Sequence, residues 1–142
     1  MSKMNKPVPQ GNYKPASRFE NIISTAGMTP RKNGELIQSG RILSTESIEN
    51  YREAILQAID NAYSAAIALV SEDEEVKQVL AMTVYVNADD NFTSHSNVAD
   101  IASDYLFENL GEAGIGSRAA IGVKSLPGNA PVEIQLVIGV VK

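Results

Sequence analysis

Residues 132–141, which read VEIQLVIGVV, decide the fold. Successive side chains of an extended strand point to opposite sides, so alternate residues share one face. One face is wholly apolar and comprises Val132, Ile134, Leu136, Ile138 and Val140. The other face is mixed and comprises Glu133, Gln135, Val137, Gly139 and Val141. This pattern predicts a strand whose apolar face lies under helices and whose second face contacts another subunit rather than water.

The segments before this strand predict an α+β fold. Helical periodicity marks residues 46–71 and a second helix, which Thr93 or Ser94 caps and Gly111 ends. Apolar and β-branched runs predict the remaining strands at residues 22–27, 35–38, 79–87 and 118–126. The resulting order is β-β-α-β-α-β-β, with both helices on one face of a mixed sheet.

The helix at residues 46–71 has recognisable ends. Apolar residues from Ile48 to Leu69 recur every three or four positions, which is the spacing of one helical face. Ser44 or Thr45 is suited to cap the start of this helix. The charged run at residues 71–75 is expected to be a solvated loop beyond its end.

The chain is expected to consist of a tail and one domain. Residues 1–12 are polar, with two prolines and a glycine, and predict a flexible N-terminal tail before a single domain at residues 13–142. Residues 13–19 are interpreted as a transition into the first strand. Residues 29–34 have turn composition, in which Asn-Gly supplies positive φ.

The composition excludes several classes of protein. The 142 residues suffice for one domain and include no cysteine, which excludes disulfide scaffolds, Cys-zinc sites and thiol nucleophiles. His95 is the only histidine, so a multi-His metal site is excluded. Residues 33–142 hold 16 acids against six bases, and such an acidic body argues against nucleic-acid binding. No run of about 18 apolar residues exists, so no membrane partner is expected. A cytoplasmic location is expected instead.

Two features that resemble functional motifs are interpreted as structural. Residues 114–119 fit G-x-G-x-x-A, but these glycines follow a helix and open a strand, the reverse of a dinucleotide-binding turn. His95 lies among serine and asparagine near the start of the second helix and is expected to be a surface residue.

Arg118 and Glu133 are the candidates for chemistry. Small neighbours leave space around Arg118, whose guanidinium could hold a carboxylate or phosphate, or form a structural salt bridge to Glu133 or to an acid of another subunit. Glu133 is the only acid of its strand. Contact of its face with a neighbouring subunit would desolvate Glu133, raise its pKa and improve it as a proton acceptor. A paired structural charge is the alternative for Glu133.

The stretch SRAAIGVKSLP at residues 117–127, followed by VEI at 132–134, resembles the C-terminal signature of the YjgF/Rid family. Members of this family are reactive intermediate deaminases and also carry the name endoribonuclease L-PSP. Residues 12–16 and 22–30 are similar to the family's N-terminal segment, especially in its chorismate-mutase-like subgroup. The resemblance covers nearly everything after residue 11.

This resemblance implies the Bacillus chorismate-mutase-like (YjgF-like) fold and a homotrimer whose sheets form a central barrel, with ligand sites in three clefts between subunits. In deaminase members, the residue matching Arg118 holds the substrate carboxylate. The residue matching Glu133 helps position the water that attacks a 2-imino acid, which gives a 2-keto acid and ammonia without a metal or cofactor. Tyr13, Gly27 and Ala120 are expected to join Arg118 in binding the substrate.

Four positions differ from the family pattern. Ala26, Met28, Gly116 and Ala120 stand where members often carry serine, glutamine, histidine and cysteine, respectively. Two alternative functions are therefore expected. The first is hydrolytic deamination of reactive enamine or imine (2-aminoacrylate-like) intermediates. The second is a non-catalytic trimeric module that binds small carboxylates or keto acids.

Overall fold

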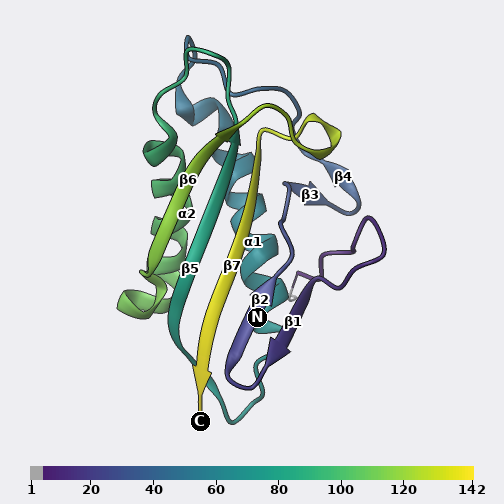
Figure 1. Cartoon of the computed structure of the whole chain (residues 1–142), viewed down its shortest axis with the longest axis vertical. Coiled ribbons are helices and arrows are strands. Elements are labelled where there is room, and N and C mark those ends of the chain that lie inside the picture. Colours follow the sequence, from purple (N-terminus) through teal and green to yellow (C-terminus); the bar gives the residue numbers. More distant parts are fainter. Residues whose placement is uncertain (1–4) are drawn as a thin grey trace.

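A five-stranded sheet forms the centre of the fold in the order β1-β2-β7-β5-β6 (Figure 1). The computed structural model describes residues 5–142. The strands are β1 (Ala16–Phe19), β2 (Ile22–Thr25), β5 (Glu75–Asn87), β6 (Ser117–Val123) and β7 (Val132–Val141). β5 and β6 run parallel, whereas the other neighbouring strands are antiparallel. The mixed sheet predicted from the sequence is therefore confirmed.

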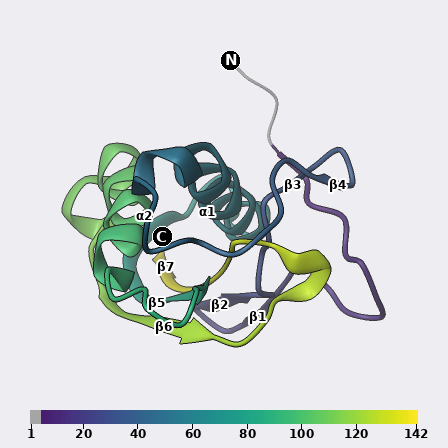
Figure 2. The same cartoon turned by 90° about the horizontal axis from the view of Figure 1, so that it is seen from above.

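Two helices, α1 (Arg52–Ile67) and α2 (His95–Leu110), cover the same face of this sheet (Figure 2). Short 3₁₀ turns are η1 (Ile48–Tyr51), η2 (Gly111–Gly114) and η3 (Pro127–Asn129). The opposite face of the sheet carries no helix among residues 5–142. Within these residues, no helix has the length and apolar content needed to cross a membrane. The α+β architecture is confirmed.

The core lies between the helices and the apolar face of the sheet. The predicted apolar face of β7 is buried, with every member at most 1% exposed. Alanines on the buried face of α1 let its backbone approach β7 closely, and this face comprises Ala54, Ile55, Ala58, Ile59, Ala62, Ala65 and Ala66. The other face of β7 is partly exposed throughout. The alternation in residues 132–141 therefore predicted both the strand and its buried side.

The N-terminal strands differ from the prediction. Residues 16–19, interpreted as part of a transition, form β1, which pairs with β2 through a tight turn at Glu20 (φ 53°). Phe19 is 77% exposed, so this edge strand lacks the apolar burial that would mark it in the sequence. An ion pair distant in sequence holds it instead: the Arg18 guanidinium donates to both carboxylate oxygens of Glu74 at 2.7 Å.

The strand predicted at residues 35–38 is shorter and lies outside the main sheet. β4 (Glu35–Leu36) pairs only with β3 (Arg31–Lys32), in a two-stranded hairpin of its own. The predicted Asn-Gly turn joins the two strands, with φ of 55° at Asn33 and 85° at Gly34. The turn prediction is confirmed, and the assignment of residues 35–38 to the main sheet is wrong.

The ends of the first predicted helix are also corrected. Ser47, rather than Ser44 or Thr45, caps the 3₁₀ turn that precedes α1, and its hydroxyl accepts from the Glu49 N–H. Ser44 instead donates its N–H and hydroxyl to Asp89. α1 ends at Ile67 rather than at residue 71, and β5 begins at Glu75 rather than at residue 79.

Candidate functional site

Glu133 projects from the face of β7 that carries no helix, and its carboxylate lies against Gly27. A Cβ atom at Gly27 would stand 2.2 Å from Oε2 of Glu133, so only glycine leaves room for this carboxylate. Glu133 is partly buried, and this burial raises its pKa. The sequence-based expectation of a desolvated glutamate with a raised pKa is met within the single chain.

Backbone pairing with β7 holds Gly27 in this place. The Met28 N–H donates to the Ile134 carbonyl at 2.7 Å, and the Ile134 N–H donates to the Met28 carbonyl at 2.9 Å. The Leu136 N–H donates to the Thr25 hydroxyl at 3.0 Å. The segment after β2 therefore follows β7, which sets Gly27 beside Glu133.

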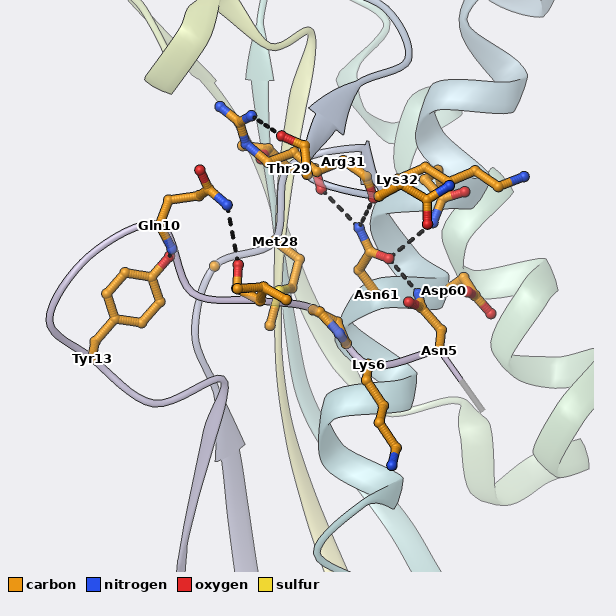
Figure 3. A pocket seen from close by; sticks show the side chains of 16 residues that line it. Asn5, Lys6, Gln10, Tyr13, Met28, Thr29, Arg31, Lys32, Asp60 and Asn61 are labelled. Carbon is orange, nitrogen blue, oxygen red and sulfur yellow. Dashed lines mark hydrogen bonds between the residues drawn. The ribbon is translucent and has the colours of Figure 1, made fainter. Parts of the chain in front are cut away.

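Tyr13 and Gly27 line a pocket of about 730 Å³ (Figure 3). Its walls come from the segment that starts at Asn5, from the chain between Gly27 and Gly34, and from α1. Lysine and arginine side chains dominate the charge of its lining, which includes Lys6, Arg31, Lys32 and Asp60. The Tyr13 hydroxyl accepts from the Gln10 N–H at 3.1 Å, which orients the ring at the pocket edge.

Asn61 of α1 organises the wall of this pocket. It is 3% exposed, and its amide nitrogen donates to the carbonyls of Thr29 at 3.0 Å and Arg31 at 2.9 Å (Figure 3). Its amide oxygen accepts from Gln57 at 2.9 Å and from Asn5. These bonds tie α1 to the chain before and within β3.

Asn61 is not among the residues predicted from the sequence, although its position carries a signal. Asn61 adjoins Ala62 on the apolar stripe of the helix, where a polar residue requires hydrogen-bond partners in the core. Its neighbour Asp60 accepts from the Tyr105 hydroxyl at 2.6 Å, and burial together with this bond raises the pKa of Tyr105. The pair therefore joins α1 to both the pocket wall and α2.

Arg118 projects from β6 toward α2 and has three partners there. Its Nη1 lies 2.8 Å from Oδ1 of Asp100 and donates to the Ser103 hydroxyl at 2.9 Å. Its Nη2 donates to the Ser96 carbonyl at 3.2 Å. Of the alternatives left open by the sequence, the structure contains an internal salt bridge, and its acid is Asp100 rather than Glu133.

Arg118 keeps capacity for a ligand despite this salt bridge. A guanidinium has five N–H donors, and three of them have partners among residues 5–142. The side chain is 26% exposed, so part of it is in contact with solvent. Such an arginine can bind a further carboxylate.

Ala120 and Gly122 continue the face of β6 that Arg118 occupies. Ala120 packs against the core, and a Cβ atom at Gly122 would stand 2.6 Å from Nε2 of His95. His95, expected at the surface, is therefore partly buried over Gly122, with its ring edge-on to Phe92. The candidate binding residue Ala120 thus lies on the strand between Arg118 and the imidazole.

Arg118 and Glu133 lie on opposite faces of the sheet within one chain. Arg118 is in register with Met82, which is buried beneath the helices, whereas Glu133 is in register with Tyr85. Met82 and Tyr85 are three positions apart on β5, an odd number, so Arg118 and Glu133 point to opposite faces. The candidate residues therefore form two groups, with Tyr13, Gly27 and Glu133 in one and Arg118 and Ala120 in the other.

The described part of the chain offers no obvious metal centre. Among residues 5–142, no three histidine, aspartate or glutamate side chains gather in a way that could hold a metal ion. The charged groups of the candidate site are the Arg118 guanidinium and the Glu133 carboxylate, whose pKa is raised by burial.

Comparison with known proteins places the chain in a family. The profile of a family described as Endoribonuclease L-PSP matches residues 3–140. Protein TCP17 from Trypanosoma cruzi is 27% identical over 117 residues, which cover 82% of this chain and 73% of TCP17. The fold is similar to that of Atu1372 from Agrobacterium tumefaciens, a protein of unknown function (TM-score 0.82, 25% identity, 95% and 87% of the two chains). It is also similar to YyfA from Yersinia pestis, of the conserved Rid protein family (TM-score 0.69, 23% identity, 97% and 95%). Because the profile spans nearly the whole sequence, the chain belongs to the YjgF/Rid family, whose profile is the one described as Endoribonuclease L-PSP.

Proposed function

We propose that the protein hydrolyses reactive 2-imino and enamine acids, such as 2-aminoacrylate, to 2-keto acids and ammonia. Arg118 binds the substrate carboxylate, Glu133 positions the attacking water, and Tyr13, Gly27 and Ala120 complete the binding site. The observation that carries this proposal is the Glu133 carboxylate, held against Gly27 where burial raises its pKa. A carboxylate with a raised pKa is a better general base near neutral pH.

The proposed site is formed between subunits of a homotrimer. Arg118 belongs to the edge strand β6, and Glu133 lies on the opposite face of the sheet, so a cleft that contains both requires two chains. The face that carries Glu133 also exposes apolar side chains, with Ile22 at 42% and Ile121 at 44%. Burial of such side chains against a second copy would favour association.

The reaction requires little beyond orientation. The enamine takes up a proton at carbon to give the imine, whose carbon is electrophilic. Glu133 accepts a proton from water as the oxygen attacks this carbon, and the resulting carbinolamine receives that proton on nitrogen. Ammonia then leaves as the hydroxyl group gives up its proton to solvent, which forms the carbonyl of the 2-keto acid. Fixing the substrate carboxylate on Arg118 supplies the orientation that makes the attack effectively intramolecular.

Two observations favour the alternative, a module that binds keto acids without turnover. Met28 is 8% exposed, and its backbone N–H and carbonyl are both bonded to Ile134, so this position offers the site no polar group. A Cβ atom at Gly116 would stand 1.9 Å from the Val79 carbonyl oxygen, which excludes a histidine side chain there. The site is therefore less polar than the family pattern.

A coupled assay separates the two functions. A pyridoxal-phosphate dehydratase acting on serine generates 2-aminoacrylate, and pyruvate release is followed with and without the protein. The enzyme hypothesis predicts acceleration above the spontaneous rate and a fall of about 10²–10⁴-fold in Glu133→Gln. Glu75→Gln, which neutralises an exposed carboxylate at the start of β5, is the matched control and keeps full activity. Pyruvate binding without any acceleration by the wild type would establish the binding module instead.

A further inference from the structure

We propose that Asp100 is an internal carboxylate that competes with the ligand carboxylate for Arg118 and thereby lowers the affinity of the site. This inference rests on the proposed function, because it assumes that Arg118 is the carboxylate-binding residue. It adds a residue of α2 that sets affinity without touching the reacting atoms.

The Asp100 carboxylate binds Arg118 at the distance expected for a ligand carboxylate. Its Oδ1 lies 2.8 Å from Nη1 of Arg118, the distance of a charge-assisted hydrogen bond. The Asp100 side chain is 59% exposed and that of Arg118 is 26% exposed, so the ion pair is open to solvent. An incoming carboxylate reaches the guanidinium from the same solvent, and it must either displace Asp100 or bind beside a like charge.

Neutral groups alone can orient the guanidinium. Ser103 accepts from Nη1 through its hydroxyl, and Ser96 accepts from Nη2 through its carbonyl. Both acceptors come from α2 and carry no net charge. The contact with Asp100 is therefore not required to aim Arg118, and its main effect on an anionic ligand is electrostatic.

The charge of α2 strengthens this effect. Between His95 and Leu110 the helix contains three acids and no lysine or arginine, and these acids are Asp100, Asp104 and Glu108. Arg118 thus faces an acidic helix. A ligand with one carboxylate can be accommodated here, whereas each further negative charge increases the repulsion.

The inference is tested with pyruvate as the probe, by calorimetric titration of the wild type and three variants. Asp100→Asn keeps the shape and a hydrogen-bond acceptor but removes the charge. It should bind pyruvate about 3- to 10-fold more tightly, the effect of one partly solvated like charge at close range. Asp104→Asn also removes one negative charge, one turn further along α2, from a residue that does not contact Arg118. Because solvent and salt screen this more distant charge, the variant should change the affinity for pyruvate by less than about 2-fold.

Salt provides a second readout. At about 1 M salt the Debye length falls to about 3 Å, so the difference between the wild type and Asp100→Asn should shrink toward none. A difference that is independent of salt would show that Asp100 acts through shape and would overturn the inference.

Arg118→Ala distinguishes failure of the inference from failure of the proposed function. Pyruvate binding that survives in Arg118→Ala, or is absent from both the wild type and Asp100→Asn, refutes the proposed site and the inference together. Pyruvate binding that is lost in Arg118→Ala but unchanged or weakened in Asp100→Asn refutes the inference alone, because Asp100 would then orient Arg118 rather than compete for it. Tighter binding confined to Asp100→Asn supports both.

Discussion

Gly27→Ala tests whether the position of the Glu133 carboxylate sets the reaction rate. The added Cβ atom would stand 2.2 Å from Oε2, 2.8 Å from Cδ and 3.1 Å from Cγ of Glu133. Ordinary contact between such atoms is about 3.5 Å, so the carboxylate must move by roughly 1 Å or more. A displacement of this size can cost about 10²-fold in rate.

The expected result in the coupled assay is a loss of about 10²-fold in turnover, with pyruvate binding retained through Arg118. Because burial raises the pKa of Glu133, a carboxylate pushed toward solvent should titrate at lower pH, and the acidic limb of the pH–rate profile should shift downward. The Glu133→Gln background is the control, since Gly27→Ala should add little once the carboxylate is gone. Full activity in Gly27→Ala with an unchanged pH profile would refute the reasoning.

Three further outcomes are expected. The bond to Arg18 lowers the pKa of Glu74 from 4.5 to about 2, so the folded state loses this stabilisation as the pH falls from about 5 toward 2. In thermal unfolding, the melting temperature should therefore fall more steeply with decreasing pH in the wild type than in Glu74→Gln, and equal slopes in the two proteins would contradict this. Asn61→Ala leaves the carbonyls of Thr29 and Arg31 without their donor and should lower the free energy of unfolding in urea by about 1–3 kcal/mol, and an unchanged midpoint would show that water replaces the amide. Sedimentation equilibrium should give three times the chain mass of 15.2 kDa, and a monomer mass at micromolar concentration would refute the trimer.

The sequence predicts the parts of the fold that depend on local pattern. The alternation in β7, the periodicity of α1 and the Asn-Gly turn are each contained in a few neighbouring residues, and all three are confirmed. β1 could not be found this way, because Arg18 is held by Glu74, which lies 56 positions away. The start of β5 likewise depends on a distant partner, because Glu75 pairs with Val141.

The candidate site shows the same division. The sequence indicates Arg118 and Glu133 as candidates, and the alternation in β7 indicates that Glu133 is desolvated. Their placement on opposite faces could not, because it depends on how β6 and β7 each align with β5. The contact between Arg118 and Asp100 likewise depends on how α2 packs beside β6, which no local pattern encodes.

The central position of β7 has a consequence for synthesis on the ribosome. β7 lies between β2 and β5, although it is the last of these strands to be translated. β2 can pair with β1 at once, but at about 5–20 residues per second it waits several seconds before its other partner, β7, emerges. During that interval the face of α1 that packs on β7 stays uncovered. Folding is thus completed only once residues 132–141 have left the exit tunnel.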